Sequence, residues 1–456
     1  NVGGWKDIAP RHSMAYRMQH RVRNTVIYVL VAALAFVGTA AAATLLDING
    51  TIKDGEVKII PQKGQQEPKL IDPNAGKPIE LLVMGQDTRD GADNASIGGG
   101  DTSEGSHQAD TTMVVQISAD RSYINLVSIP RDSLVDAPSC ETSKGTISAQ
   151  YNVMFNSIFA NGYTTGDDLA SAASCTVNAV NSLTGLNIQN FIVVDFNGLK
   201  DMINAIGGVK ICIPSDVKDP YTGLDLTKGL HQLDGLAATQ YARTRYSLGD
   251  GSDVQRTTRQ QYLIKQLLQQ ALDKNIFTHT SELYQLAKSA LKSLNISQGL
   301  ADTATLAGLA MSLKNLNVSH MYTRTLPVVQ APSDPNRVVW DSSADELWTK
   351  MREGKPFVEQ PAQDSSSSDS ANTNNDSSNT SDQAQDSTPS DQDNAQATPQ
   401  NTRVADGVEK TADGKYIDTA TGGEIDTETG AVKDINTGQV LGISEAYLNN
   451  VVCPVQ

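Results

Sequence analysis

The sequence predicts an α/β/α sandwich with a central mixed sheet, preceded by one transmembrane helix and followed by a disordered stalk. Short β-branched apolar runs alternate with longer helical patterns between residues 79 and 327, which is typical of sheets covered by helices. The segments 24–46 and 358–403 on either side have compositions that do not suit a globular core. The folded domain is therefore expected at 77–357.

The segment 24–46, NTVIYVLVAALAFVGTAAAATLL, carries no charge. At about 1.5 Å per residue it is long enough to cross a bilayer core of roughly 30 Å. Four arginines lie within residues 1–23, so we expect a cytoplasmic basic segment, a single-pass anchor in the cell membrane and an extracytoplasmic remainder. A cleaved signal peptide is the alternative, but the apolar run is longer than its usual core. Residues 47–76 are expected to be a linker.

Acidic residues concentrate towards the C-terminus. The formal net charge is −16, and residues 359–456 contain 17 acidic against 4 basic residues, so no nucleic-acid partner is expected. Residues 358–403 are rich in Ser, Asp, Asn and Gln, which predicts a disordered linker acting as a tether or stalk. The acidic tail 404–456 has no assigned function, and its loose D-T-x-T-G repeat predicts short turns.

The elements of the domain follow from hydrophobic period and from cap residues. Asp167 is expected to cap a helix that Gly185 ends, and Gly207 is expected to end another. Strands are predicted at 79–84, 111–118, 123–129, 191–196, 209–214 and 318–327, and helices at 167–185, 197–208, 233–245, 254–272, 281–294 and 300–313.

The stretch 241–261, YARTRYSLGDGSDVQRTTRQQ, holds four arginines in a nearly neutral part of the chain. If a helix begins near Asp253, then Arg256, Arg259 and Gln260 lie within one turn of each other. Guanidinium groups bind phosphate oxygens in a bidentate manner and stay charged, so the cluster predicts an anion site. The alternative is a solvated helix surface with Asp250 and Asp253 as partners.

Polar residues also stand where predicted strands end. Asp87 and Arg89 follow the first strand, Arg131 and Asp132 follow another, and Asp110 stands at the entry to a third. Ligands of α/β sheets bind beyond strand ends. Asp87 and Asp110 together suit a hard cation such as Mg²⁺, which takes its other ligands from phosphates and water. Aspartates and arginines around phosphate are typical of phosphoryl transfer.

Six blocks, in this order, resemble the LytR-CpsA-Psr family: LLVMGQDTRDG, QADTTMVVQIS, INLVSIPRDSLV, FIVVDFNGLKDMINAIGGVKICIP, GLHQLDGLAATQYARTRY and DVQRTTRQQ. The resemblance covers about residues 79–271. It implies a membrane-anchored extracytoplasmic phosphotransferase. Such enzymes move a glycopolymer from a polyprenyl-pyrophosphate carrier onto peptidoglycan, and the lipid lies in an apolar tunnel between the sheet and later helices.

Carried over by position, the resemblance implies that Asp87 and Asp110 hold Mg²⁺ (or Mn²⁺). It implies that the pyrophosphate is bound by Arg131, Arg243, Arg245, Arg256 and Gln260. The residues expected to be catalytic are Asp87, Asp110, Arg131 and Arg245. Arg89 and Arg259 match positions less firmly tied to the head group. Two family cations are replaced here by Gln108 and Gln150, which is expected to weaken the hold on phosphate.

The four cysteines lack C-x-x-C spacing and neighbouring histidines, so disulfides or free buried thiols are both compatible with the residues alone. The resemblance implies a bridge between Cys140 and Cys175. Relatives often pair the cysteine at the position of Cys212 with one in the following loop, which has none here. We therefore expect Cys212 to pair with Cys453.

Three classes of function remain compatible with the sequence. The first is the polymer transferase, and the second is a hydrolase that cuts polyprenyl pyrophosphates with the same groups and water as acceptor. The third is a non-enzymatic wall-binding or signalling protein, which the two missing cations favour. The aspartates Asp87 and Asp110, together with the arginines, argue against the third.

Overall fold

The computed structural model describes residues 46–64, 69–87, 107–273, 288, 291–358 and 401–454. The predicted anchor lies outside these residues except for Leu46, as do Arg89, most of the predicted helix 281–294 and residues 359–400 of the predicted disordered linker. Within the described ranges, the structure contains no helix that combines the length and apolar character needed to cross a membrane.

The centre of the molecule is a mixed sheet, as predicted, and it has seven strands; the predicted strand at 209–214 lies outside it, in a separate hairpin. The strands of the sheet, in spatial order, are β1 (Glu56–Val57), β14 (Asn295–Ser297), β9 (Asn190–Val194), β2 (Ile79–Asp87), β3 (Gln108–Ile117), β4 (Ile124–Ile129) and β15 (Met321–Thr325). The pairs β1/β14, β2/β9 and β4/β15 are parallel, whereas β9/β14, β2/β3 and β3/β4 are antiparallel.

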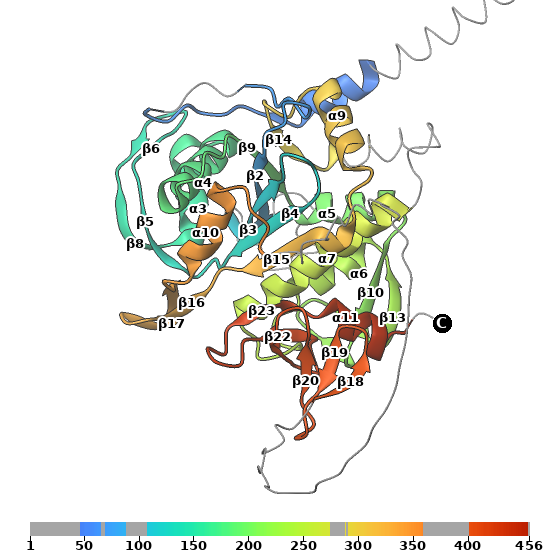
Figure 1. The fold of residues 1–456 in the computed structure, drawn as a ribbon. Coiled ribbons are helices and arrows are strands. Elements are labelled where there is room, and N and C mark those ends of the chain that lie inside the picture. The colour runs from blue at the N-terminus through green and yellow to red at the C-terminus, as the bar shows by residue number, and fades with distance from the viewer. Residues whose placement is uncertain are drawn as a thin grey trace, which may run out of the picture.

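Helices cover both faces of this sheet (Figure 1). One face carries α3 (Phe155–Gly166), α4 (Leu169–Thr184) and α10 (Ala344–Arg352), and the other carries α5 (Phe196–Ala205), α6 (Gly235–Arg243) and α7 (Asp253–Asp273), with α9 (Thr303–Leu313) near its end. Alternate β2 side chains enter different cores: Leu82 packs with Phe159 and Trp348, and Leu81 with Met113. The predicted α/β/α sandwich is therefore confirmed.

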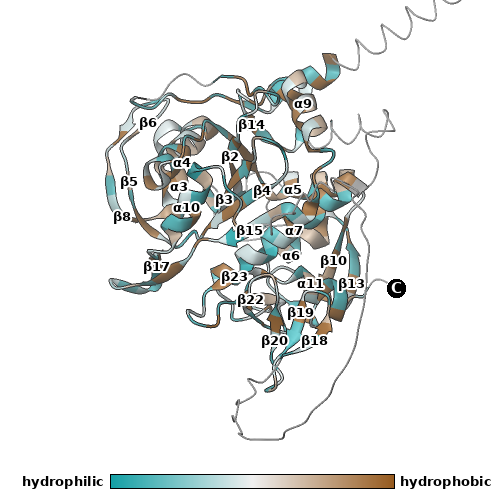
Figure 2. Cartoon of the chain, in the orientation of Figure 1, coloured by the Kyte–Doolittle hydropathy of each residue, from teal (hydrophilic) through white to brown (hydrophobic). Residues whose placement is uncertain are grey.

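Small hairpins flank the sandwich. They are β5 (Leu134–Ala137) with β8 (Gln150–Met154), β6 (Cys140–Glu141) with β7 (Thr146–Ile147), β10 (Val209–Ile213) with β13 (Gly229–Leu233), β11 (Val217–Asp219) with β12 (Leu224–Leu226), and β16 (Val328–Ala331) with β17 (Asp334–Trp340). In Figure 2, α6 and α7 contain both hydrophobic and hydrophilic residues, as expected of helices with one face packed on the domain.

The expected linker 47–76 is partly built into the domain, so the predicted boundary at residue 77 is wrong. Residues 46–54 are helical, and Ile52 is only 1% exposed within a core that includes Ile79. The strand β1 then pairs with β14 at the edge of the central sheet. A two-residue strand gives no periodic signal in the sequence.

Helix α3 was not predicted, and the predicted N-cap of α4 is displaced by one residue. Asp168 caps α4 by accepting a hydrogen bond from the Ser171 amide at 2.7 Å. Asp167 instead ends α3 in the left-handed region at φ 57°. Gly185 ends α4 at φ 69°, as predicted.

The acidic tail is a folded module, which we call the C-terminal sheet (402–454). It is an antiparallel meander of β18 (Thr402–Ala405), β19 (Val408–Lys410), β20 (Tyr416–Asp418), β21 (Glu424–Ile425), β22 (Ala431–Lys433) and β23 (Val440–Ile443), followed by α11 (Glu445–Tyr447) and a π-helical turn (Leu448–Val452). The repeat forms the predicted turns: Asp418, Asp426 and Asp434 each accept amide hydrogen bonds. The sequence predicted these turns but not the strands that they connect.

The C-terminal sheet packs against the domain below α6 and α7 (Figure 1). Glu445 pairs with Lys265 at 2.7 Å, and Ser215 donates to the Glu428 carbonyl at 2.8 Å. Apolar side chains of both parts share one core, among them Tyr447 and Tyr262. Because the two parts share an apolar core, an ion pair and a hydrogen bond, the C-terminal sheet belongs to the same folded body.

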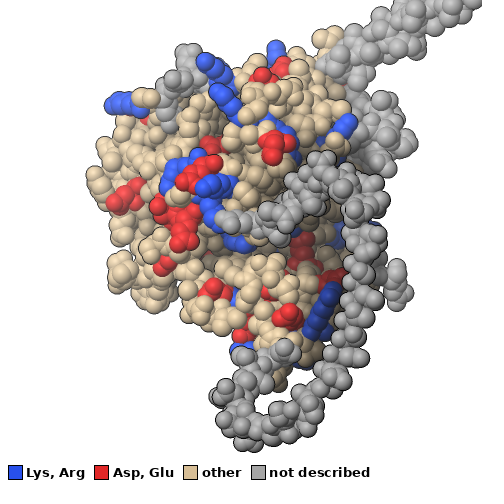
Figure 3. Space-filling view, in the orientation of Figure 1, with Lys and Arg blue, Asp and Glu red and all other residues tan. Residues whose placement is uncertain are grey.

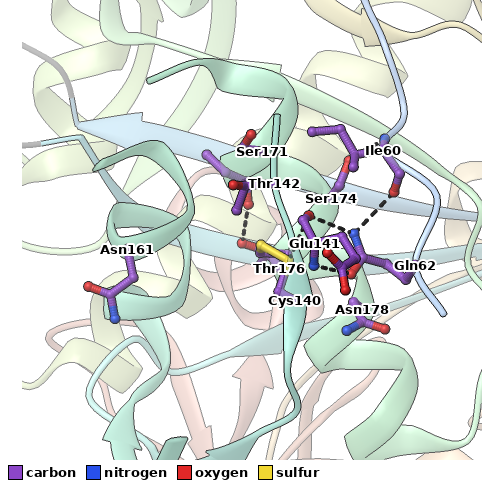
Figure 4. The surroundings of a disulfide bond; sticks show 12 residues. Ile60, Gln62, Cys140, Glu141, Thr142, Asn161, Ser171, Ser174, Thr176 and Asn178 are labelled. Atoms are coloured by element: carbon purple, nitrogen blue, oxygen red, sulfur yellow. Dashed lines mark hydrogen bonds between the residues drawn. A yellow bond between two sulfur atoms is a disulfide. The ribbon is translucent and has the colours of Figure 1, made fainter. Parts of the chain in front are cut away.

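Both expected disulfides are formed. Cys212 in β10 pairs with Cys453 and has a Cα–Cα distance of 6.1 Å, while the Cα atoms of Cys140 and Cys175 are 5.5 Å apart. Figure 4 shows Gln62 beside Cys140, where it exchanges hydrogen bonds of 3.0 and 2.8 Å with the Glu141 backbone. The chain before the predicted domain is thereby fastened near the first disulfide.

Candidate active site

Several of the predicted site residues lie at one edge of the central sheet, where strands end or begin. Strands β2, β4 and β9 end there and β3 begins there, because β2 and β9 are parallel and β3 is antiparallel to both β2 and β4. Asp87 ends β2 opposite Gln108, and a register shift after Gly85 leaves Asp110 without a partner residue in the β2–β3 ladder. Such bulges redirect side chains. Arg131 follows β4 at the same edge.

Arg131 and Arg256 both contact Asp110. Arg131 Nη1 donates to Asp110 Oδ2 at 2.7 Å, and Arg256 Nη1 lies 3.8 Å from the same oxygen. Arg256 Nη2 also donates to the Asp110 carbonyl at 2.9 Å. Strand β3, the segment after β4 and the first turns of α7 are therefore brought together around one carboxylate.

Asp253 is a second carboxylate between these arginines, and the sequence did not identify it as a site residue. Its Oδ1 lies 2.5 Å from Arg256 Nη2 and 3.5 Å from Arg131 Nε. Burial raises the pKa of Asp253, while the two guanidinium groups act in the opposite direction. Asp253 and Arg256 are each 7% exposed, so the alternative of a solvated helix surface is wrong here.

Arg243 and Arg245 lie beside this cluster and are half buried. The Arg243 guanidinium lies 4.5 Å from the centre of the Phe196 ring, just beyond the end of β9. Helix α6 ends at Arg243, so Arg245 stands in the following loop and not within the helix. Its Nε donates to the Gly251 carbonyl at 2.8 Å.

Gln260 and Arg259 have different roles from each other. Gln260 accepts a hydrogen bond from Thr111 Oγ1 at 3.0 Å, which places it beside Asp110. Arg259 is 4% exposed and donates to the carbonyls of Thr244 and Leu248. Burial lowers the pKa of Arg259 to about 10. Arg259 therefore holds the α6–α7 loop and does not face the carboxylate cluster.

The two glutamines that replace family cations make neutral contacts with α3. Gln108 Oε1 accepts from Asn156 at 3.3 Å, and Gln150 Oε1 accepts from Asn161 at 3.1 Å. Neither contact supplies positive charge. The expected weakening of the phosphate site stays a prediction.

The carboxylates of Asp87 and Asp110 are chemically compatible with a hard divalent cation such as Mg²⁺. They occupy adjacent ends of β2 and β3, and the described residues contain no group of three or more His, Cys, Asp or Glu side chains suited to a metal. Two carboxylates suit Mg²⁺, which keeps water and takes phosphate oxygens as ligands. Arg131 Nε and Arg256 Nε form no hydrogen bond among the described residues, although Arg131 Nε lies 3.5 Å from Asp253 Oδ1, so both groups can still donate to an anion.

The fold and this edge define a class: an α/β/α domain whose strand ends bring arginines and aspartates together. The chain belongs to the LytR_cpsA_psr family, whose model matches residues 44–353. The match includes the residues before 77 that the structure adds to the domain. The C-terminal sheet lies beyond it.

Curated relatives are distant. The cell wall biosynthesis protein LcpA of Corynebacterium glutamicum is 26% identical over 310 residues, covering 64% of this chain and 58% of LcpA. The probable cell wall biosynthesis protein LcpB of the same organism is 29% identical over 279 residues, covering 59% of this chain and 60% of LcpB. This chain thus spans about three fifths of each. The polyisoprenyl-teichoic acid–peptidoglycan teichoic acid transferase TagT of Bacillus subtilis is 25% identical over 305 residues, covering 65% and 82%.

Among solved structures, a Streptococcus agalactiae protein superimposes with a TM-score of 0.51 at 20% identity, covering 63% of this chain and 91% of that one. This likeness supports the fold.

Proposed function

We propose that this protein is a phosphotransferase that moves a glycopolymer from a polyprenyl-pyrophosphate carrier to peptidoglycan and releases polyprenyl phosphate. Family membership and the transferase name of the TagT relative support the class of reaction. The observation that carries the proposal is the convergence of Arg131 and Arg256 on Asp110 at the strand edge. A doubly charged bridging group such as pyrophosphate suits several guanidinium groups in a water-poor site.

The chain's own groups contribute mainly positioning and charge. Arg131, Arg243, Arg245 and Arg256 would bind the pyrophosphate oxygens, and Gln260 would add a neutral contact. When the acceptor hydroxyl attacks the polymer-side phosphorus, the lipid phosphate leaves and negative charge grows on the bridging oxygen. Preorganised guanidinium groups stabilise that charge as it forms. Asp253 keeps two of these cations together before substrate arrives.

Asp87 and Asp110 are the residues that would hold Mg²⁺ (or Mn²⁺). The cation, when bound, would neutralise charge on the phosphate oxygens. Because Asp110 also contacts Arg131, the same carboxylate joins the predicted cation site to the arginines.

The proposed location is the outer face of the cell membrane. The uncharged run 24–46 with its basic flank would anchor the chain, and two disulfides suit an oxidising compartment. Protease added outside intact cells should remove everything beyond residue 46 from protein that fractionates with membranes. A soluble mature form would favour signal cleavage.

Reconstitution tests the activity directly. Purified protein is incubated with carrier-linked polymer and peptidoglycan, and wall-attached polymer is measured beside free polymer. We expect wall-attached product, and we expect Asp110→Asn to abolish it while Asp345→Asn, an exposed change on α10, has no effect. Free polymer alone would identify a hydrolase, and no turnover would favour a non-enzymatic protein.

A further inference from the structure

Two exposed tyrosines lie beside the arginine cluster. In the described part of the chain, the large aromatic side chains with high exposure are Tyr151, Tyr221 and Tyr246, at 76%, 74% and 67%. Tyr221 and Tyr246 contact each other, with ring centres 5.9 Å apart and planes inclined by 58°. The Arg245 guanidinium lies 5.5 Å from the centre of the Tyr246 ring. Singly scattered apolar side chains are ordinary on a surface, whereas here two exposed aromatic rings contact each other and one of them lies against an arginine of the predicted site.

The tyrosines stand on well-fixed backbone. Tyr221 lies in the turn between β11 and β12, where Asp219, only 2% exposed, accepts its amide hydrogen bond at 2.9 Å. In the same turn, Thr222 Oγ1 lies 3.0 Å from Thr244 Oγ1. Thr244 is fully buried and separates Arg243 from Arg245 in the chain. The turn is therefore fastened to the arginine-bearing segment, and the exposed rings are held there by buried polar contacts.

We propose that Tyr221 and Tyr246 form a saccharide-binding platform for the carrier-proximal sugars of the donor substrate. The assignment rests on the proposed function, because it places the pyrophosphate at Arg245. A pyranose ring presents a flat face of C–H bonds that packs on the electron-rich face of an aromatic ring, while its hydroxyls stay in water. The exposed, amphipathic side chains of Tyr221 and Tyr246 suit this chemistry.

The position of Tyr246 against Arg245 indicates that the platform binds sugars of the donor substrate and not of the acceptor. The sugar bonded to the pyrophosphate must lie within about one ring of the arginines that bind it, and Tyr246 contacts one of them. Because Tyr221 and Tyr246 are exposed to solvent, they are unsuited to bind the lipid end of the donor, which requires an apolar environment. A hydrophilic polymer must leave the protein through solvent.

Two probes separate sugar binding from phosphate binding. One is a short-chain polyprenyl pyrophosphate without sugar, and the other carries an N-acetylhexosamine disaccharide on the same group. Dissociation constants are measured by calorimetry on the full chain. We expect Tyr221→Ala and Tyr246→Ala each to weaken the sugar-bearing probe about three- to twentyfold and the sugar-free probe by less than about twofold. Tyr246→Phe should retain wild-type affinity.

Ile435→Ala is the matched surface control, because Ile435 is 62% exposed on the C-terminal sheet. Circular dichroism melting checks that each variant is folded. Equal losses on both probes, or no loss on either, would overturn the platform. Unchanged donor affinity with a raised KM for peptidoglycan would place the tyrosines at the acceptor and overturn the assignment. If wild type fails to bind the sugar-free probe, the phosphate site itself is wrong. If Arg245→Lys leaves that binding intact, Arg245 does not bind the pyrophosphate, and the platform loses the contact that places it at the donor.

Discussion

Burial decides what individual charged residues do in this site. The spacing of Asp253 and Arg256 is equally compatible with a solvated pair and with a buried one, so sequence could not assign Asp253. Sequence did single out Asp87, Asp110 and Arg131 as candidates, because polar residues at the ends of apolar strands are conspicuous. Charge composition alone could not separate Arg259, which holds a loop, from Arg256, which contacts the carboxylates.

We predict that Asp253→Asn impairs both transfer and stability. The change removes one of the two negative charges that lie between the largely buried guanidinium groups of Arg131 and Arg256, so that only Asp110 still offsets their repulsion. Losing one member of a buried pair costs about 3 kcal/mol, and transfer should fall about 10- to 100-fold. Thermal melting and the reconstituted transfer assay measure the two effects.

Asp250→Asn is the control for this change, since Asp250 is exposed and its Oδ1 accepts a local hydrogen bond from the Ser252 amide at 2.8 Å. Equal melting temperatures and rates for the two variants would contradict the bridging role.

We predict that Arg245→Lys lowers transfer by about one to three orders of magnitude, because lysine keeps the charge but loses the bidentate fork. Arg259→Lys should lower transfer less and the melting temperature more, because Arg259 donates to two buried carbonyls. The readouts are transfer rate and melting temperature on the same preparations. A wild-type rate for Arg245→Lys would assign that arginine a structural role only.

At the scale of elements, the α6–α7 loop depends on glycine conformation and on the C-terminal sheet. Gly249 has φ +73°, and a Cβ there would meet Gln255 Oε1 at 1.5 Å and Thr429 Cγ2 at 3.0 Å. Positive φ favours glycine, and the lack of a side chain permits this approach. The loop that carries Arg245 is thus in contact with a turn of the C-terminal sheet.

We predict that Gly249→Ala destabilises the protein more than Gly438→Ala and also lowers transfer. Gly438 has a similar φ of +71°, and a Cβ at that position would meet nothing within 4 Å, so its substitution costs only the backbone strain of about 1–2 kcal/mol. Gly249→Ala adds the steric displacement of Gln255 and Thr429. Chemical denaturation and transfer rates compare the two. Equal effects would show that the close approach is unimportant.

Sequence predicted the elements that carry a long signal and missed those defined by pairing. The strand β3 has ten residues with an apolar pattern, and α7 has twenty-one, so both were found. Helix α3 contains two glycines, one of them its last residue, and three Ser or Thr residues, which lowers its intrinsic helix propensity. The strands of the C-terminal sheet are two to four residues long, too short for periodicity, and only their mutual pairing defines them.

At the scale of the whole molecule, charge is distributed without a single dominating patch on the face shown in Figure 3, where acidic and basic side chains mingle. The strong negative charge of the sequence therefore does not define a binding surface there. What joins the parts is a shared apolar core and the bond between Cys212 and Cys453.

We predict that Cys212→Ser lowers the free energy of unfolding by about 2–5 kcal/mol, because the lost crosslink spans 241 residues. The C-terminal sheet should stay docked through its apolar contacts. Cys453→Ser and the double variant should lose the same amount, since all three lack the same bond. Denaturant titration measures the losses, and additive losses in the double variant would contradict the pairing.

The same bond changes what the Ser-rich stretch can be. Sequence suggested a tether, yet the described chain leaves the folded body at Val358 and returns to it at Asn401. Both ends of the stretch 359–400 are therefore joined to the same folded body. A protease that cuts within 359–400 would leave two fragments, one with Cys212 and one with Cys453, which migrate together on a gel until a reductant separates them.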